Sequence, residues 1–459
     1  MRAVIIVGLG FGDEGKGATV DALVRQHNAK LVVRYSGGPQ CGHRVELPDG
    51  TAHIFAQFGS GTLAGASTYI GPKVIISLEA LEREAQALQK IGISNPYALL
   101  SVFPGCLIAT RYHVALNRLL EGARGAARHG SCGMGVGVTR QLAQVTGCHL
   151  HLRDFEGSPS LNWLIEQLEL TRAVCRHMFA EELYPQETRT GEEYDGTLPP
   201  PPPHLSEQLH GEWELLNSDE PPVELAAQMR EIASKVSTGL FPAVYGELDA
   251  PVIFEGAQGV LLDENWGFHP HTTWSTVTQQ HALELLKSTY KPWQVSVLGV
   301  IRTYHTRHGE GPLPTHVPGL AETRVDKCNA TNPWQGDIRH GHFDLPLFRY
   351  AMEVVKPDGL VVNCCDHSSN TYYCPEYREH FPNRIDTSLA NGERIGRFLQ
   401  TAKPILLPAE NSQDILGVLR FQDAPVVLEG WGPTHEDRKW NGFVLPYRDL
   451  ENVREKVEA

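Results

Sequence analysis

Residues 3–17 read AVIIVGLGFGDEGKG, an apolar run that passes directly into a glycine-rich loop. A short apolar run closed by glycines is typical of a buried parallel strand. Residues 18–26 then follow a helix-like pattern, and in a strand–loop–helix unit the loop amides and the helix start attract anions. The stretch therefore predicts an α/β fold with a phosphate-binding loop, in which Lys16 supplies a positive charge.

The loop differs from the Walker A motif in two ways. Gly17 follows Lys16 where that motif has the serine or threonine that binds Mg²⁺, and the acids Asp13 and Glu14 lie inside the loop. An acid among phosphate-binding groups is unfavourable unless it holds Mg²⁺ or takes up a proton. We therefore expect the loop to take part in metal or proton chemistry as well as phosphate binding.

Other short apolar runs extend the pattern along the chain. They lie at residues 31–38, 251–256, 295–302, 359–363, 405–407 and 425–430, with a helix-like stretch at 78–90. Together they predict a mostly parallel central sheet flanked by helices, in a single domain of residues 1–459. Glycines cluster after several of these runs, and open parallel sheets bind ligands at the carboxyl ends of their strands. A nucleotide is expected at that edge.

Composition excludes several classes of protein. Of the 459 residues 41% are hydrophobic, and the net charge of −14 does not suit binding to a nucleic-acid backbone. No run approaches the length of a membrane helix and no signal peptide is recognised, so no membrane contact and a cytoplasmic location are expected. The nine cysteines show no Cys-x-x-Cys or zinc-finger spacing, which favours reduced thiols over a zinc site.

Residues 188–222 differ in character from the rest of the chain. They are acidic and polar, and they contain the proline run from Pro199 to Pro203. Such a run can form neither a helix interior nor a central strand. We expect an exposed insertion loop.

Four motifs, in the same order along the chain, resemble those of the adenylosuccinate synthetase family. They are GDEGKG at 12–17, VVRYSGGPQCGH at 32–43, FEGAQGVLLD at 254–263 and YHTRHGEGPLPT at 304–315. The resemblance implies that family's fold and a two-step ligation. A nucleoside triphosphate first phosphorylates the 6-oxygen of a purine nucleotide, and the amino group of L-aspartate then displaces the phosphate. The resemblance also implies a homodimer.

Family positions imply a role for each matching residue. Asp13 would remove the proton from ring N1 and bind Mg²⁺, His43 would donate to the transferring phosphoryl group, and the Gly42 carbonyl would be a further Mg²⁺ ligand. The remaining implied sites are Gly12, Glu14, Gly15, Lys16, Gly17 and Gly42 for the triphosphate; Gln40, Ser131, Cys132, Gln258 and Thr273 for the nucleotide substrate; Asn363, Asp366, Gly430, Trp431 and Gly432 for the triphosphate's base; and Thr331 and Arg339 for aspartate. Ser131 and Cys132 lie in the run GSCGMGVG at 130–137, which resembles the family's glycine-rich loop around the substrate phosphate.

Three departures from the family pattern leave the substrates open. Gln40 stands where asparagine is usual, and Arg44 where threonine is usual. The run NCCD at 363–366 lacks the lysine of the family's guanine-reading motif, so ATP competes with GTP as the donor. Arg339 is alone in a loop where the family offers several arginines, which are the side chains that best grip paired carboxylates.

The departures indicate a divergent member of the family. Phage-type relatives that make 2-aminoadenylosuccinate from dGMP commonly replace the catalytic acid, whereas Asp13 is retained here, so an IMP-like substrate ranks before GMP or dGMP. A purine analogue ranks third. Two further hypotheses are a nucleotide-binding paralogue without ligase activity and a phosphotransferase that stops after the first step.

Overall fold

The computed structural model describes residues 1–125, 128–183, 209–241, 249–320, 334–367, 371–382, 387–409, 411–442 and 444–457. A large central sheet has the strand order β17-β16-β13-β9-β1-β8-β2-β5-β6-β7, and β18 pairs with β9. Its strands are β1 (Arg2–Gly8), β2 (Leu31–Arg34), β5 (Ser67–Ile70), β6 (Leu100–Val102), β7 (Ser237–Thr238), β8 (Val252–Glu255), β9 (Gln294–Arg302), β13 (Gly359–Asn363), β16 (Val426–Gly430), β17 (Arg438–Trp440) and β18 (Arg448–Asp449). Only the pairs β16–β17 and β18–β9 are antiparallel among these described strands. The predicted α/β class and mostly parallel sheet are confirmed.

Strand β1 lies near the middle of the sheet and is buried on both faces. Ala3, Ile5 and Val7 belong to the core on one face, and Val4 and Ile6 belong to the core on the other. Helix α1 (Lys16–His27) packs on the second face, while α8 (Gln280–Lys287) and α10 (Leu345–Val355) pack on the first. Burial on both faces explains why apolar residues follow one another in this strand and do not alternate with polar ones.

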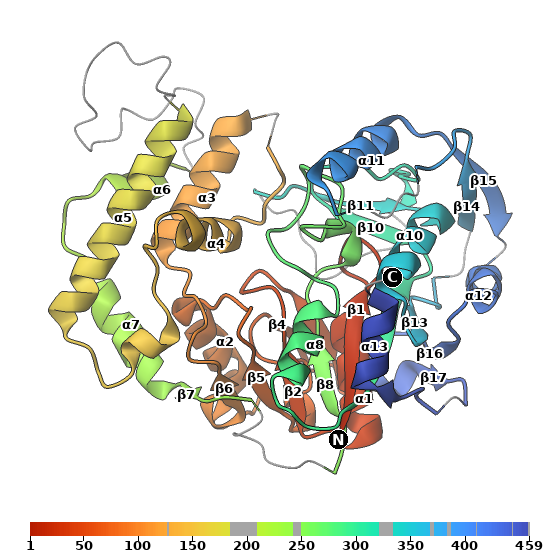
Figure 1. Ribbon diagram of the computed structural model, residues 1–459, viewed down its shortest axis with the longest axis horizontal. Helices are drawn as coiled ribbons and strands as arrows, with labels where there is room; N and C mark the ends of the chain where they lie inside the picture. Colours follow the sequence, from red (N-terminus) through yellow and green to blue (C-terminus); the bar gives the residue numbers. More distant parts are fainter. Residues whose placement is uncertain are drawn as a thin grey trace.

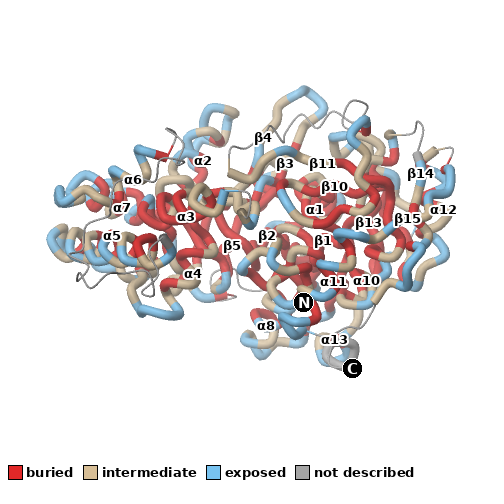
Figure 2. Tube along the Cα trace, turned by 90° about the horizontal axis from the view of Figure 1, so that it is seen from above, coloured by how far each residue is buried: buried red, intermediate tan, exposed pale blue. Residues whose placement is uncertain are grey.

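A third hydrophobic core joins the helices that lie to one side of the sheet (Figure 1). These helices are α2 (Leu78–Lys90), α3 (Arg111–Arg124), α4 (Val136–Val145), α5 (Leu161–Leu183), α6 (His210–Asn217) and α7 (Val223–Lys235). Helix α2 has the bounds that the sequence predicts. Its start is fixed by Ser77, whose side chain caps the helix and accepts a hydrogen bond from the Ala80 amide. Figure 2 shows the buried residues running continuously from these helices into the sheet.

Smaller sheets surround the carboxyl edge of the central one. They comprise β3 (His43–Glu46) with β4 (Ala52–Phe55), β10 (His305–His308) with β11 (Ile338–Gly341), and β12 (Phe343–Asp344), β14 (Thr371–Tyr377) and β15 (Pro404–Ala409). The remaining helices are α11 (Leu389–Thr401), α12 (Ser412–Arg420), α13 (Leu450–Val457) and the 3-10 helices η1 (Thr62–Ala64), η2 (Pro96–Leu99), η4 (Leu152–Phe155), η7 (Val260–Leu262) and η8 (His435–Asp437).

One predicted strand lies outside the central sheet. Residues 405–407 were expected to form a buried parallel strand, but they belong to β15, which pairs antiparallel with β14 at the edge of a small sheet. Leu406 and Leu407 are exposed there. Pro404 and Pro408 cannot donate backbone hydrogen bonds, which confines the strand to an edge. The prediction of a parallel core strand is therefore wrong for this run.

The segment 188–222 is described only in part. Residues 188–208 lie outside the described residues, so their expected exposure stays a prediction. Residues 209–222 include helix α6, whose Leu216 is buried in the helical core. Within the described residues, none of the helices combines the length and the apolarity needed to cross a bilayer.

Candidate active site

The glycine-rich loop leaves β1 at the carboxyl edge of the sheet and leads into α1. Gly12, Asp13 and Gly15 all have positive φ angles, of 90°, 60° and 87°. The left-handed conformation is unfavourable for a residue with a side chain, although aspartate tolerates it better than most. Two other non-glycine residues with positive φ also lie at this edge: Gln258 follows β8, which pairs with β1, and Cys364 follows β13, which pairs with β9. The edge where the sequence predicts a nucleotide therefore includes three non-glycine residues in an unfavourable backbone conformation.

Inside the loop, Glu14 and Lys16 form a buried ion pair. Lys16 Nζ lies 2.5 Å from Glu14 Oε2, and both side chains are almost fully buried. The other carboxylate oxygen accepts hydrogen bonds from the amides of Gly10, at 3.0 Å, and Gly12, at 2.8 Å. Glu14 was expected among the phosphate-binding residues, but its carboxylate occupies loop donors itself and fixes the loop and Lys16 in place.

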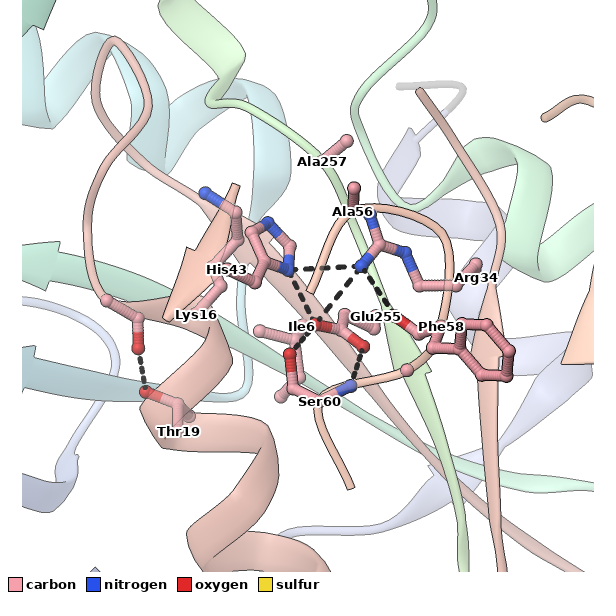
Figure 3. Close-up of polar contacts among 12 residues, drawn as sticks. Ile6, Lys16, Thr19, Arg34, His43, Ala56, Phe58, Ser60, Glu255 and Ala257 are labelled. Atoms are coloured by element: carbon pink, nitrogen blue, oxygen red, sulfur yellow. Dashed lines mark hydrogen bonds and ion pairs between the residues drawn. The ribbon is translucent and has the colours of Figure 1, made fainter. Parts of the chain in front are cut away.

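A second buried cluster lies beside the loop and centres on His43 (Figure 3). His43 Nδ1 lies 2.5 Å from Glu255 Oε1, and Arg34 Nη1 lies 3.5 Å from the same oxygen. The Ser60 amide donates to the other oxygen of Glu255 at 2.9 Å, and the Ser60 hydroxyl also donates to this carboxylate. A side chain on Gly17 would meet His43 at 2.9 Å, so the cluster lies directly against the first turn of α1.

Electrostatics within this cluster define the protonation of His43. Burial, the Arg34 charge and Lys16 lower the pKa of His43 to about 4, although Glu255 acts in the opposite direction. Burial opposes ionisation of Glu255, but Arg34 and His43 outweigh it and lower its pKa to about 2. At neutral pH the carboxylate is ionised and the imidazole is neutral. Its Nδ1–H then donates to Glu255, which leaves Nε2 for a ligand.

Sequence reasoning found His43 but missed Glu255 and Arg34 as functional residues. Strands β2 and β8 are parallel neighbours, and their register places Arg34 opposite Glu255 at the carboxyl ends. Each is the charged last residue of an otherwise apolar strand, LVVR and VIFE. The sequence therefore contained a signal for this pair, because a charged residue at the end of a buried strand requires a partner of opposite charge.

The loop at 130–137 connects α3 to α4 and contains two predicted substrate residues. Glu121 of α3 accepts hydrogen bonds from the amides of Gly130, at 2.9 Å, and Ser131, at 3.2 Å. The Ser131 hydroxyl donates to Asn117 at 2.9 Å. Cys132 is half-buried, and burial raises the pKa of its thiol to about 11. In this state of the protein the Ser131 hydroxyl and the amides of Gly130 and Ser131 are therefore already engaged by α3.

Two amide side chains predicted to contact the nucleotide remain available for hydrogen bonding. The side-chain oxygens of Gln40 and Gln258 are buried and have no hydrogen-bond partner in the described structure. Buried carbonyl oxygens of this kind are costly to leave without a donor. The two side chains are therefore suited to donors on a purine ring. Thr273, the third predicted contact, is half-buried, and its amide donates to the Leu262 carbonyl at 2.8 Å.

The residues predicted to bind the triphosphate's base divide into two groups. The side chain of Asn363 is buried, donates to the Glu14 carbonyl at 2.8 Å and accepts from Arg438, so it braces the phosphate loop. Asp366 is exposed and accessible to a ligand. Trp431 is half-buried, and its indole N–H donates to Glu429 at 3.1 Å.

Glycines flank that tryptophan. The Gly430 carbonyl accepts from the Cys365 amide at 2.9 Å, and a side chain on Gly432 would meet Asp437 at 2.6 Å. The segment 430–432 is thus fixed against its neighbours.

The predicted aspartate site is only partly described. Thr331 lies outside the described residues. Arg339 donates three hydrogen bonds to the carbonyls of Gly309 and Gly311, at 2.6 to 3.0 Å. The buried Arg307 is similarly committed to three backbone carbonyls, including that of Pro312 at 3.1 Å. Both guanidinium groups therefore hold the segment that follows β10, at residues 309–312.

The space around the loop is narrow in this state of the protein. A crevice with about 160 Å³ of empty space is lined by Gly10, Gly12, Arg302 and Thr306, between the loop and the end of β9. A larger hollow with about 910 Å³ of empty space lies elsewhere, beside α2 and α7. Its charged groups, Glu82 and Lys235, bind each other and leave no free charge for a ligand. The loop edge remains the better candidate for phosphate chemistry.

The oxygen donors near the loop suit only some metal ions. Asp13 offers a carboxylate and Gly42 a backbone carbonyl, and both are partly accessible. In the part of the chain that is described, no group of three or more histidine, cysteine, aspartate or glutamate side chains could hold a metal ion. A few hard oxygen donors fit Mg²⁺ that is shared with a nucleotide's phosphates, and they do not fit a transition metal.

Comparisons with known proteins agree with this geometry. A family model for adenylosuccinate synthetase matches residues 5–198 and 203–391. An adenylosuccinate synthetase of Desulforamulus reducens is 30% identical over 441 residues, which cover 93% of this chain and 91% of the relative. One from Pseudomonas aeruginosa PAO1 is 31% identical over 380 residues, which cover 80% of this chain and 77% of the relative.

Two solved structures have a similar fold. The fully ligated adenylosuccinate synthetase of Plasmodium falciparum has a TM-score of 0.66 at 17% identity, covering 96% of this chain and 99% of that one. The succinoaminodeoxyadenylate synthetase of cyanophage S-2L, bound to dGMP and to dATP as an energy donor, has a TM-score of 0.51 at 16% identity, covering 100% and 98%. At these sequence identities the similarity shows a shared fold and nothing more specific.

Proposed function

The chain belongs to the adenylosuccinate synthetase family and is a nucleotide-dependent C–N ligase, and we propose that it joins L-aspartate to the 6-position of an IMP-like nucleotide with Asp13 and His43 as catalytic residues. The observation that carries the proposal is the buried contact of His43 with Glu255 beside the phosphate loop. A protein that only binds nucleotides has no need for a histidine held by a buried carboxylate. That cluster therefore favours the ligase over a paralogue without ligase activity.

The proposed reaction has two steps. Asp13 takes the proton from ring N1, and the electron pair moves to the 6-oxygen, which attacks the γ-phosphorus and releases the nucleoside diphosphate. The amino group of aspartate then attacks C6, and the C6–O bond breaks as inorganic phosphate leaves. Phosphorylation is required because the ring oxygen is a poor leaving group by itself.

His43 supports the first step through its protonation. In the structure its pKa is lowered to about 4, chiefly by burial and the Arg34 charge. The negative charge of a phosphoryl group beside Nε2 raises the pKa of His43 again, and Glu255 stabilises the imidazolium from the Nδ1 side. His43 then carries protons on both nitrogens and donates to the oxygens at which charge develops.

We propose Mg²⁺ as the cofactor, held by Asp13 and the Gly42 carbonyl together with the phosphates of the triphosphate. When bound, it supplies positive charge that neutralises those phosphates. Lys16 is held by Glu14 at the same loop and adds a second positive group there. A homodimer, a cytoplasmic location and the remaining predicted contacts, including the exposed Asp366 for the donor's base, are part of the same proposal.

One assay matrix tests this function. IMP, dIMP, GMP and dGMP are each combined with ATP or GTP, with and without aspartate, and both phosphate and succinylated nucleotide are measured. We expect aspartate-dependent product with IMP or dIMP. Product only with GMP or dGMP would identify the substrate as a 2-aminopurine nucleotide. Phosphate release that does not depend on aspartate would favour the phosphotransferase. No product in any combination would refute the ligase for these substrates.

A further inference from the structure

We propose that Arg118 is a positioning residue that clamps the loop at 130–137 to helix α6 and to Trp334, and that this clamp sets the affinity for the substrate nucleotide's phosphate. The inference rests on the proposed function, in which that loop holds the phosphate. Arg118 belongs to none of the four sequence motifs, and it lies on α3, outside the strand ends that form the rest of the site.

Three contacts of Arg118 join segments that are far apart in the sequence. Its Nε donates to the Gly133 carbonyl of the loop at 3.1 Å. Its Nη1 donates to Glu212 of α6 at 2.7 Å, in an ion pair whose side chains are 28% and 16% exposed. Its guanidinium carbon lies 5.0 Å from the centre of the Trp334 ring. One planar cation thus holds a loop, a helix and an indole at once.

Gly133 shows how closely these parts are packed. Its φ of 71° lies in the left-handed region. A side chain at this position would meet the Trp334 ring at 2.8 Å and Arg118 Cγ at 3.2 Å. The glycine therefore permits both the turn and the contact, and the loop has little room to shift while Arg118 and Trp334 stay in place.

Arg118 differs from the other side chains of α3 that hold this loop. Glu121 accepts from the amides of Gly130 and Ser131, and Asn117 accepts from the Gly135 amide at 3.1 Å. Those bonds tie the loop to its own preceding helix only. Arg118 adds the link to α6 and to Trp334, so it couples the loop to the two segments that flank it. Loss of this link should let the loop depart from the position in which it receives the nucleotide's phosphate.

The first test separates positioning from simple charge. Arg118→Ala should raise the KM for the nucleotide monophosphate about tenfold and leave kcat and the KM for the triphosphate within about twofold. Arg118→Lys keeps the charge but cannot contact Gly133 and Glu212 at the same time, so it should not restore the KM. Full rescue by lysine would overturn the clamp and assign the effect to the charge of residue 118.

The matched control lies on the same helix. Arg111 forms an ion pair with Glu79 but has no described contact with the loop. Arg111→Ala should leave the KM for the nucleotide monophosphate unchanged. Glu212→Gln removes the charge at the far end of the clamp from a partly exposed position, so it should give a smaller rise in KM and remains informative if Arg118→Ala does not fold.

A second readout is independent of catalysis. Amide hydrogen exchange at residues 130–137 should become faster in Arg118→Ala and in Glu212→Gln, and stay unchanged in Arg111→Ala. Unchanged exchange and unchanged KM in both clamp variants would overturn the inference. If the wild-type protein turned over no nucleotide while exchange still responded as expected, the clamp would stand as a structural device and the proposed function would fail.

Discussion

At the scale of single residues, the Glu255 carboxylate decides what His43 can do. It holds the Nδ1 side of the ring at 2.5 Å and keeps Nε2 directed away from the carboxylate. It also balances the buried charge of Arg34. Removing it therefore acts on catalysis and on stability at the same time.

We predict that Glu255→Gln lowers kcat by about 10-fold to 100-fold and changes the KM values little, because the stabilisation of the imidazolium is lost. The same substitution should lower the free energy of unfolding by about 3 kcal/mol, since Arg34 is left buried without its counter-charge. Steady-state kinetics and urea unfolding measure the two effects.

Ser60→Ala is the matched control for this residue. It removes one hydrogen bond to the same carboxylate and keeps the charge. Its effect on kcat should be only a few-fold. If Ser60→Ala and Glu255→Gln were equally active, the carboxylate would have no part in catalysis.

Single residues also show the limit of sequence reasoning. The spacing within GDEGKG was enough to predict the loop, because strand, loop and helix are contiguous. The partnership of His43 with Glu255 spans 212 positions and arises only from strand order. Likewise, nothing in the sequence indicated that Glu14 binds the loop's own amides and Lys16.

At the scale of elements, the loop after β1 depends on the loop after β8. A side chain on Gly259 would collide with the Gly10 carbonyl and with Glu14. Strands β1 and β8 are direct neighbours, so the two loops must pass each other closely. The glycine at 259 is therefore required by the packing of two loops and not by its own φ angle.

We predict that Gly259→Ala lowers the free energy of unfolding by about 1 to 3 kcal/mol and weakens triphosphate binding, because the phosphate loop has to move. The comparison is Gly417→Ala in the middle of α12, where the added methyl group would meet nothing within 4 Å. That change should raise the free energy of unfolding by about 0.5 to 1 kcal/mol. Thermal unfolding of both variants measures the difference, and equal midpoints would contradict the close approach.

Element prediction succeeded where burial and periodicity agreed. The amphipathic spacing of residues 78–90 defines α2, and the run at 3–8 lies in β1. It failed at 405–407, because an apolar run does not reveal which sheet it joins, and β15 is an exposed edge strand. Part of the segment at 188–222 is helix α6, whose residues carry no proline.

At the scale of the whole molecule, buried histidines make stability depend on pH. Burial lowers the pKa values of His43, His113, His281 and His305 to about 4 in the folded protein. Asp344 acts in the opposite direction, because burial raises the pKa of its carboxyl group to about 7. Between pH 4 and the ordinary histidine value of about 6.5, the unfolded chain binds the histidine protons and the folded protein does not.

We predict that stability falls as the pH falls from about 6.5 towards 4. Each of the four histidines contributes up to about 1.4 kcal/mol per pH unit, and Asp344 offsets one of them because its folded form holds a proton in this window. The net slope of stability against pH should therefore correspond to about three protons. Urea unfolding at pH 7.5, 6 and 5 measures it, and a flat profile over this range would contradict the burial of these side chains.

The central claim is that the 6-oxygen of the nucleotide becomes part of the released phosphate. A nucleotide monophosphate that carries a heavy oxygen isotope at the 6-position tests this directly, with aspartate, the triphosphate and Mg²⁺ present. We predict that the label leaves with inorganic phosphate in proportion to succinylated product, and that Asp13→Asn slows both by about 10²-fold to 10⁴-fold. Unlabelled phosphate, or label retained in the nucleotide, would contradict this transfer of the 6-oxygen.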